Sequence, residues 1–282
     1  MATTDFYNNK IVAITGAGSG MGRSYATLLA AQGAKLLLSD IDEDALTETL
    51  ALLCPDVSTS PNIASMVMDV SNPEHWLAFK QLAIDTFAGC HMLINNAGIE
   101  GAAQPAWAST PEQLQRTMDV NFFGVVTGCR TFLPLLVAQE WAALVNISSI
   151  FGFVGTPNAS DYCASKFALR GYTEALMVEL AHVHPQVQVH LVHPGGVDTD
   201  ISRSHRTAKF KRRFLTTPSD EMCNVVLSQV QDNNPRIIYG NHAQKTYWLS
   251  KILPLTQLRK LLAKGLKLVD QDDYRKDHHG FK

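Results

Sequence analysis

The chain of 282 residues is long enough to bury one substantial core, and no linker between its two halves stands out. Its composition is that of an ordinary globular protein, with 46% hydrophobic and 18% charged residues and a net charge of −2. Because neither sign of charge dominates, the composition gives no support to a nucleic-acid partner.

The five cysteines are scattered along the chain and never form a C-x-x-C pair. This pattern argues against a disulfide framework and against a zinc site, and it favours reduced, buried thiols. We predict no metal site. The first ten residues hold no apolar signal segment, and no stretch reaches about 18 uninterrupted apolar residues, so we expect a cytoplasmic protein.

Short apolar runs alternate with longer amphipathic segments from residue 10 to residue 240. We expect strands at 10–16, 34–40, 63–70, 90–98, 141–149, 187–196 and 236–240, and helices at 21–33, 42–53, 73–87, 112–139, 161–183 and 219–231. Strands that are apolar on both faces and separated by helices predict an α/β fold: a doubly wound, Rossmann-type parallel sheet of about seven strands with helices on both faces. Within the 112–139 helix, Pro134 is expected to kink or end it.

The first strand runs into "TGAGSGMGRS" (15–24), in which every second residue is glycine. A glycine-rich turn between a strand and a helix can present backbone N–H groups to a pyrophosphate, although a plain βα turn gives the same pattern. The G-x-G-x-x-G fingerprint would need glycine where Met21 stands. The residues satisfy T-G-x-x-x-G-x-G instead, through Thr15, Gly16, Gly20 and Gly22, and we interpret Gly18 as a permissive filler outside this set.

Asp40 ends the second strand, where a dinucleotide fold usually places an acid on the adenosine ribose. A carboxylate there accepts hydrogen bonds from the ribose hydroxyls and repels a 2′-phosphate, which predicts NAD as cofactor rather than NADP. The alternative is a solvated acid that, with its acidic neighbours at 42–44, stabilises the start of the next helix.

Tyr162 and Lys166 are four residues apart in a segment rich in helix formers, so their side chains share one helix face. A neighbouring ammonium favours phenolate, and we expect it to lower the tyrosine pKa toward the range useful for acid–base catalysis. A surface pair with no joint role is the alternative.

Ser149 lies 13 residues before Tyr162, and Asn121 lies in the preceding helix. In order and spacing, these four residues and the glycine turn resemble the classical short-chain dehydrogenase/reductase family over roughly residues 8 to 240. The resemblance implies that Tyr162 is the general acid/base, that Ser149 binds the substrate oxygen, that Lys166 tunes Tyr162 and holds the nicotinamide ribose, and that Asn121 anchors a water. Ser148 competes with Ser149 for its role.

The resemblance also implies a set of cofactor contacts. Ser19 and Ile41 stand where NADP-using relatives often carry a basic residue, which again favours NAD. Without the resemblance, Asp69 reads as a helix cap, and "NNAG" (95–98) and the Pro-Gly segment at 194–195 read as ordinary turns. The predicted cofactor-binding residues are Gly16, Ser19, Gly20, Met21, Gly22, Asp40, Asp69, Val70, Asn95, Ala97, Gly98, Tyr162, Lys166, Pro194, Gly195, Val197 and Thr199.

These expectations together describe an NAD-dependent oxidoreductase that interconverts a hydrophobic secondary alcohol and its ketone in a single domain, 1–240. An NAD(H)-binding, redox-responsive protein with little turnover is the alternative. The loops after the strands supply apolar candidates for the substrate pocket, which core packing explains equally well: Ile99, Phe151, Phe153, Val154 and Pro157. The basic segment 202–214 either meets an anionic substrate tail or is a solvated face.

The extension 241–282 begins with one or two basic amphipathic helices in 243–269, broken near Pro254. They could pack on their own subunit, complete a subunit interface, or lie peripherally on an anionic membrane. By resemblance we expect a homodimer or homotetramer that pairs the helices at 112–139 and 161–183.

Overall fold

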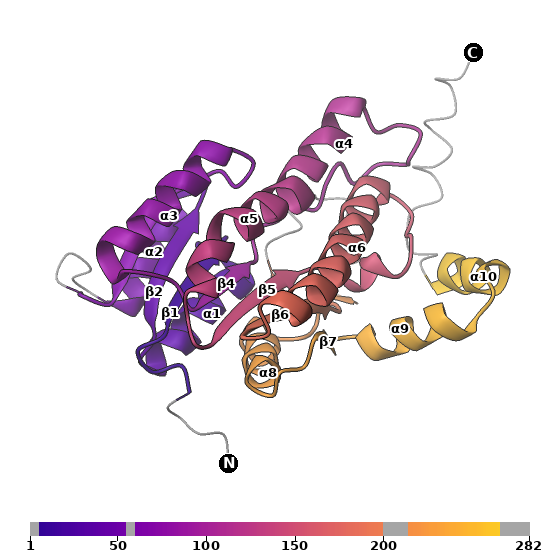
Figure 1. Cartoon of the computed structure of the whole chain (residues 1–282). Coiled ribbons are helices and arrows are strands. Elements are labelled where there is room, and N and C mark those ends of the chain that lie inside the picture. The colour runs from indigo at the N-terminus through magenta and orange to yellow at the C-terminus, as the bar shows by residue number, and fades with distance from the viewer. Residues whose placement is uncertain (1–5, 55–59, 200–213, 266–282) are drawn as a thin grey trace.

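A computed structural model describes residues 6–54, 60–199 and 214–265. Its centre is a seven-stranded parallel sheet in the order β3-β2-β1-β4-β5-β6-β7, which confirms the predicted α/β class (Figure 1). The strands are β1 (Ile11–Thr15), β2 (Lys35–Asp40), β3 (Ile63–Val67), β4 (Met92–Asn95), β5 (Ala142–Ile147), β6 (Val187–Pro194) and β7 (Arg236–Tyr239).

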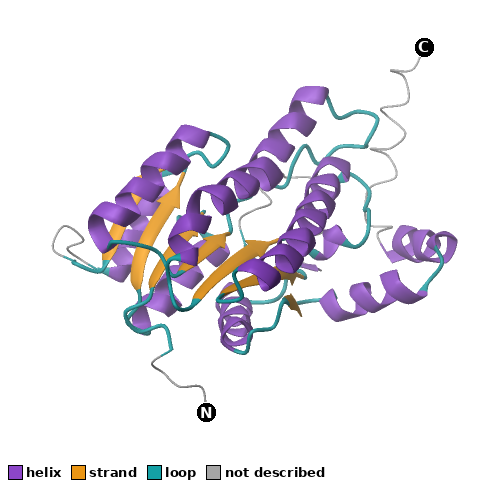
Figure 2. Cartoon of the chain, viewed as in Figure 1, coloured by secondary structure: helices purple, strands orange, loops and turns teal. Residues whose placement is uncertain are grey.

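Helices cover both faces of the sheet and enclose two separate apolar cores (Figure 2). The helices α1 (Gly20–Ala31), α2 (Glu43–Leu53) and α8 (Ser219–Gln231) pack on one face. The helices α3 (Pro73–Phe87), α5 (Gly124–Val137) and α6 (Ser160–Val183) pack on the other. Burial on both faces explains why the strand segments read as continuous apolar runs.

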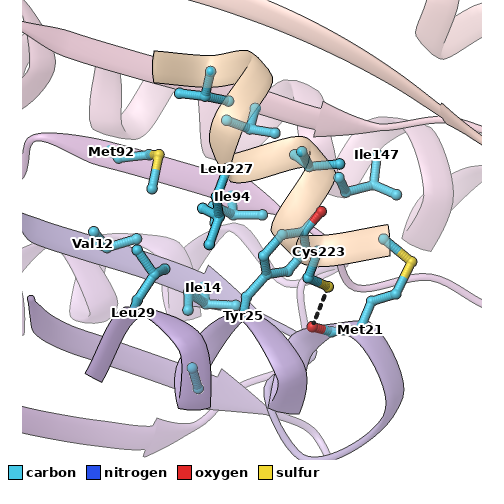
Figure 3. Packing of buried hydrophobic residues seen from close by; sticks show 14 of the residues in the cluster. Val12, Ile14, Met21, Tyr25, Leu29, Met92, Ile94, Ile147, Cys223 and Leu227 are labelled. Carbon is cyan, nitrogen blue, oxygen red and sulfur yellow. Dashed lines mark hydrogen bonds between the residues drawn. The ribbon is translucent and has the colours of Figure 1, made fainter. Parts of the chain in front are cut away.

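The close packing of α1 against α8 fixes the start of α1 (Figure 3). Tyr25 and Leu29 of α1 are fully buried beside Leu227 of α8. The Cys223 thiol, also on α8, donates a hydrogen bond of 3.4 Å to the Met21 carbonyl. Because Met21 lies in the first turn of α1, a helix distant in sequence holds this end of the glycine turn.

The expected helix at 112–139 contains an interruption that sequence analysis did not predict. It consists of α4 (Pro111–Met118), a π-helical turn η2 (Asp119–Phe123) and α5. Pro134 lies inside α5, which continues to Val137, so the irregularity falls at Asn121 rather than at the proline. By length and composition alone the 111–137 stretch could cross a membrane, but the buried side of α5 packs on the sheet and on α3.

The strand order reverses between β1 and β4, which are parallel neighbours although β2 and β3 separate them in sequence. In such sheets a ligand binds beyond the carboxyl ends of the strands at the reversal. The glycine turn follows β1 and "NNAG" begins at the end of β4, so both motifs flank this point.

The C-terminal segment forms two helices, α9 (Ala243–Ile252) and α10 (Leu255–Gly265), separated at Pro254 as predicted. They lie beyond the β7 edge of the sheet (Figure 1). Leu258 is buried in a small third core with Phe153 and Val154, so this segment packs on its own subunit.

Candidate active site

The glycine turn is built by close approach of backbone to backbone. Gly16 has φ +67°, and a Cβ on Gly22 would lie 1.8 Å from the Gly16 carbonyl oxygen. Gly20, with φ +49°, faces Thr199 of the loop after β6, whose side chain would be 3.1 Å from a Cβ at position 20. These three positions therefore exclude side chains for separate steric reasons.

Gly18 is not a permissive filler, and our interpretation of it was wrong. Its N–H donates a 2.8 Å hydrogen bond to Asp40 Oδ2, and a Cβ there would lie 2.9 Å from the same oxygen and from the Ala45 methyl group. The second Asp40 oxygen accepts from the Asp42 N–H at 3.0 Å. Asp40 thus anchors the turn as well as standing at the position expected to face the ribose.

The carbonyl side of the turn is also held, by residues that sequence analysis did not single out. Arg23 Nε donates to the Gly18 carbonyl at 3.1 Å, and the Thr49 hydroxyl donates to the Ala17 carbonyl at 3.0 Å. The Arg23 guanidinium also pairs with Glu48 at 2.9 Å. Arg23, the one basic residue of the turn at 15–24, is therefore already paired with an acid.

The start of α1 suits a pyrophosphate. Among the described residues no side chain caps this helix, because Ser19 makes no capping hydrogen bond, and its first turn holds no acid. Its N–H groups and positive dipole end are thus available to an anion. The Met21 side chain is buried in the core, so its predicted contact with the cofactor would have to be made by its backbone.

At the end of β4, Asn96 ties the two motifs together. Its backbone N–H donates to the Thr15 hydroxyl at 3.1 Å, and its side-chain amide donates to the Thr15 carbonyl at 3.0 Å and to the Gly16 carbonyl at 3.1 Å. The neighbouring Asn95 side chain points into the core, where it donates to Asn146 at 2.8 Å. A cofactor contact by Asn95 stays a prediction and would fall to its backbone.

The other predicted cofactor segments also lie at the carboxyl ends of strands. Asp69 and Val70 follow β3, and Asp69 accepts hydrogen bonds from the Ser71 N–H and hydroxyl, which hold its pKa below the usual value although burial acts to raise it. Asn72, not Asp69, caps α3. After β6, Gly195 approaches the Asn241 carbonyl so closely that a Cβ would lie 2.3 Å from it.

Tyr162 and Lys166 lie on one face of α6, as predicted, with the Lys166 ammonium 5.5 Å from the centre of the Tyr162 ring. Lys166 is buried and donates a 2.9 Å hydrogen bond to the Ile147 carbonyl at the end of β5. This bond fixes the long side chain between α6 and the sheet, with its nitrogen beside the tyrosine.

The two competing serines have different surroundings. The Ser148 hydroxyl is buried and donates to the Lys166 carbonyl at 3.2 Å. The Ser149 hydroxyl accepts from the Phe151 N–H at 3.1 Å and hydrogen-bonds with Tyr162, a contact that partly opposes the rise in the tyrosine pKa caused by burial. Only Ser149 therefore stands beside the reactive hydroxyl.

Burial dominates the titration of this pair, contrary to the expectation that the ammonium would lower the tyrosine pKa. Desolvation raises the pKa of Tyr162 to about 12, with a further increase from the charge of Glu100. Desolvation also lowers the pKa of Lys166 to about 8. For both groups, the free energy needed to remove the charged form from water exceeds the stabilisation that neighbouring protein groups provide.

Asn121 is buried in the π-helical turn, and its side chain grips the loop that follows β4. Its Oδ1 accepts from the Ile99 N–H at 2.8 Å, and its Nδ2 donates to the Ile99 carbonyl at 2.9 Å. A Cβ on Gly98 would lie 3.1 Å from this Oδ1 and 3.7 Å from the Lys166 nitrogen, so the Asn121 amide and the Lys166 ammonium both lie close to Gly98.

Asp161, directly before Tyr162, is a buried carboxylate that sequence analysis missed. Its Oδ2 accepts from the Ala102 N–H at 2.8 Å and from the Thr117 hydroxyl at 3.0 Å, and its Oδ1 accepts from the Tyr162 N–H at 2.8 Å. It joins the loop after β4, helix α4 and the catalytic helix. An acid beside the tyrosine was visible in the sequence, but its burial was not, and its partners lie 44 and 59 residues away.

The apolar candidates for the substrate pocket separate into two groups. Phe151 lies edge-on to Tyr162, with ring centres 6.1 Å apart. Phe153 is buried between His193, at 4.1 Å, and Tyr247 of α9, at 5.0 Å, and Val154 is buried beside it. Phe153 and Val154 are thus packing residues, whereas Phe151 borders the site. Most of the basic segment 202–214 lies outside the described residues.

Relatives of known sequence share most of the chain. SadH from Mycobacterium tuberculosis (strain ATCC 25618 / H37Rv) is 35% identical over 270 residues, which cover 92% of this chain and 96% of SadH. Cyclohexanol dehydrogenase from Acinetobacter sp. (strain SE19) is 34% identical over 195 residues, which cover 69% of this chain and 76% of that enzyme.

Two solved structures have the same fold. A short-chain dehydrogenase/reductase from Burkholderia phymatum in complex with NAD matches with a TM-score of 0.75 and 29% identity, covering 82% of this chain and 89% of that one. A short-chain dehydrogenase from Burkholderia cenocepacia J2315 in complex with NADP matches with a TM-score of 0.75 and 26% identity, covering 91% and 98%.

The sequence model described as short chain dehydrogenase matches residues 10–209, a stretch that includes the glycine turn and all four residues of the expected tetrad. Combined with the sheet order and with relatives that cover most of the chain, this match assigns the oxidoreductase activity of that family at the level of its class. The chain belongs to the short-chain dehydrogenase family.

Proposed function

We propose that the protein is an NAD-dependent oxidoreductase that interconverts a hydrophobic secondary alcohol and its ketone, with Tyr162 as general acid/base. The observation that carries the proposal is the meeting of Ser149, Tyr162 and Lys166 beside the cofactor crevice. The intact group argues against a binding protein without turnover, because cofactor binding alone does not require a serine hydroxyl at the tyrosine.

In the reduction direction, the Tyr162 hydroxyl, which its pKa of about 12 keeps protonated, donates its proton to the substrate carbonyl oxygen while the Ser149 hydroxyl hydrogen-bonds the same oxygen. Oxidation is the reverse: the Tyr162 phenolate, left when its own proton has departed outward, takes the proton of the substrate hydroxyl. The nicotinamide cofactor, when bound, supplies the hydride acceptor or donor. Lys166, fixed on the Ile147 carbonyl, would hold the cofactor ribose, and its ammonium, 5.5 Å from the centre of the Tyr162 ring, would stabilise negative charge that forms on Tyr162. By the family resemblance, Asn121, which lies in the π-helical turn, anchors a water that passes the proton outward.

The cofactor residues fit a dinucleotide with an unphosphorylated ribose. Gly16, Gly20 and Gly22 leave the backbone bare at the start of α1. Asp40 presents a carboxylate at the end of β2, and the nearby Arg23 guanidinium is already paired with Glu48. A 2′-phosphate would meet the Asp40 carboxylate, and Arg23, the basic residue of the turn, is already paired with an acid, so we propose NAD over NADP.

Substituting Asp40 tests the cofactor preference, but alanine would also remove the anchor of Gly18. Asparagine keeps an oxygen that can accept from the Gly18 N–H and removes the charge. We therefore expect Asp40→Asn to raise kcat/KM with NADP relative to NAD by about tenfold or more, a change that one lost charge repulsion of about 1.4 kcal/mol produces. A wild-type enzyme that prefers NADP would overturn the proposal.

For the substrate, the apolar ring of Phe151 beside Tyr162 supports a hydrophobic alcohol. The similarity to a cyclohexanol dehydrogenase adds cyclic secondary alcohols to the candidates. The direct test is a panel of linear and cyclic secondary alcohols with NAD, followed as absorbance at 340 nm, for wild type and Tyr162→Phe.

We expect Tyr162→Phe to lower kcat by at least about 100-fold, the usual scale of general acid–base catalysis, while NAD affinity measured by calorimetry changes little. NAD binding without turnover of any alcohol, and no difference between the two proteins, would favour the redox-responsive binding protein instead.

We also propose a homodimer or homotetramer in the cytosol. Large apolar side chains are exposed on the helices expected to pair, among them Leu114, Phe123, Phe167 and Val178. No disulfide joins any of the five cysteines, all of which lie in the described part of the chain, as suits a reducing compartment. Light scattering coupled to size exclusion measures the assembly, and a monomeric mass at micromolar concentration would contradict it.

A further inference from the structure

The two C-terminal helices expose apolar side chains on the surface that faces away from the protein. Trp248 is 56% exposed, Ile252 71% and Leu255 79%. Leu261 of α10 is 43% exposed. In α9, Tyr247 packs on Phe153, and in α10 the buried Leu258 lies between Leu255 and Leu261 on the same side of the helix, so part of the apolar side of each helix is already used for folding. We call the outward-facing part the α9–α10 surface.

All formal charges on this surface are positive. Residues 241–265 include no aspartate or glutamate and five basic residues, namely Lys245, Lys251, Arg259, Lys260 and Lys264, all of them exposed. In α9, positions 245, 248 and 252 are three and four residues apart, so a lysine, Trp248 and Ile252 follow one side of the helix.

The combination of exposed apolar side chains and positive charge favours a lipid surface over a second copy of the chain as the binding partner. A second copy of the chain would place the same cations against one another in a symmetric contact, which like-charge repulsion disfavours. Exposed apolar side chains on two neighbouring helices that also carry exposed lysine and arginine match a lipid surface, where the apolar groups enter the boundary of the acyl chains and the cations meet phosphates. Tryptophan is a residue typical of that boundary.

We propose that the α9–α10 surface binds the protein peripherally to a bilayer of anionic lipids. Trp248, Ile252 and Leu255 insert at the level of the headgroups, and the five basic residues contact lipid phosphates. This inference does not depend on the proposed reaction, since it rests only on the exposure and charge of the two helices.

Co-sedimentation of the full-length protein with vesicles tests the proposal. We expect binding to vesicles of 70% phosphatidylcholine and 30% phosphatidylglycerol, little binding to pure phosphatidylcholine, and a severalfold loss of binding in 0.5 M salt, because salt screens surface charge. Absence of binding to the anionic vesicles, or equal binding to both, would overturn it.

Two variants separate the apolar from the charged contribution. Ile252→Ser/Leu255→Ser and Lys251→Glu/Lys260→Glu should each lower binding at least fivefold. Leu77→Ser, at a 62% exposed position on α3, is the matched control and should bind as wild type does. Thermal midpoints within a few degrees of wild type show that the variants fold.

Two other outcomes assign the surface to a different occupant and refute the proposal. If light scattering shows an oligomer that Ile252→Ser/Leu255→Ser dissociates, a second copy covers the surface. If the variants sediment with anionic vesicles as wild type does, the basic and apolar residues of the α9–α10 surface are not the lipid contact.

Discussion

The cofactor side and the substrate side of the site are held in different ways. The backbone of the glycine turn is held mainly by the side chains of Asp40, Thr49 and Asn96, from segments that follow it in the first half of the chain, with Cys223 of α8 as the distant contribution. The surroundings of Tyr162 are fixed by side chains from distant elements, such as Thr117 of α4, which donates to Asp161, and His193 of β6, which hydrogen-bonds the Ser149 carbonyl.

The difference separates what backbone geometry requires from what packing supplies. A turn that brings main chains within contact distance admits few sequences, so it leaves a pattern of glycines. A site assembled from side chains on several elements can be built by many sequences, and the loops that carry it vary most readily with the substrate. Substitutions on the two sides should therefore fail differently.

The largest expected effect is that of Gly22→Ala on the cofactor side. The new Cβ would overlap the Gly16 carbonyl oxygen at 1.8 Å, and neither backbone can move without breaking the turn. We expect the free energy of unfolding to fall by at least about 3 kcal/mol. We expect a comparable loss in the free energy of NAD binding, measured by calorimetry. The control is Gly171→Ala on α6, where a Cβ meets nothing within 4 Å and helix propensity should add about 0.5–1 kcal/mol. Equal stability of the two variants would contradict the steric account.

Lys166→Met probes the cost of the buried ammonium. Because the folded-state pKa of Lys166, about 8, lies below the unfolded value of 10.5, the folded protein carries a penalty at pH 7 that disappears as the pH rises from 8 to 10.5. The Lys166→Met variant should be inactive when assayed with NAD. Without cofactor, its free energy of unfolding at pH 7 should exceed that of wild type by about 3 kcal/mol. Urea unfolding at several pH values measures this difference, which should shrink above pH 8. A difference that stays constant with pH would show that the lysine is not the titrating group.

Asp161→Asn tests the substrate side, where we expect a smaller loss of stability. The amide offers one acceptor oxygen in place of two, so at least one of the donors at Ala102, Thr117 and Tyr162 loses its partner, at a cost of about 1–3 kcal/mol. The KM for the alcohol should rise while NAD affinity stays the same. In Thr117→Val only one of the three hydrogen bonds is lost, and the shift in KM should be smaller. A parallel loss of NAD affinity would mean that Asp161 acts on the whole fold.

The same division explains what could be predicted from the sequence. The strand runs, the T-G-x-x-x-G-x-G spacing and the Tyr162–Lys166 pair depend on neighbours in sequence, and the structure has them where they were expected. Gly18 was misjudged because its close contact with Asp40 requires a glycine, and Asp40 lies 22 residues away in the sequence and comes close only after folding. The π-helical turn at Asn121 has no sequence marker comparable to Pro134, which suggested the wrong position.

Three-dimensional contacts also decided questions that the sequence left open. Spacing favoured Ser149 over the adjacent Ser148, and their different partners in the structure support that choice. The pKa of Tyr162 was expected to fall because an ammonium is near, but the extent of burial, which no spacing shows, has the larger effect. For the same reason Phe153 could not be assigned to the core or to the pocket before its contact with His193 was known.

The smallest expected effect concerns the link from α9 to Ser149. Tyr247 packs on Phe153, Phe153 packs on His193, and His193 Nδ1 hydrogen-bonds the Ser149 carbonyl at 2.8 Å. Tyr247→Ala should therefore lower kcat two- to fivefold and the stability by about 1 kcal/mol, with KM nearly unchanged, because the serine is displaced slightly while the pocket stays intact.

Trp248→Ala is the matched control for this link, since it removes the adjacent but exposed aromatic ring of the same helix. Its kcat should equal that of wild type, although its binding to anionic vesicles should fall. The two neighbouring residues thus separate the inner face of α9, which supports Ser149, from its outer face. If both variants lowered kcat to the same extent, loosening of the helix as a whole would explain the loss, and the stack of Tyr247, Phe153 and His193 would have no specific part in positioning the serine.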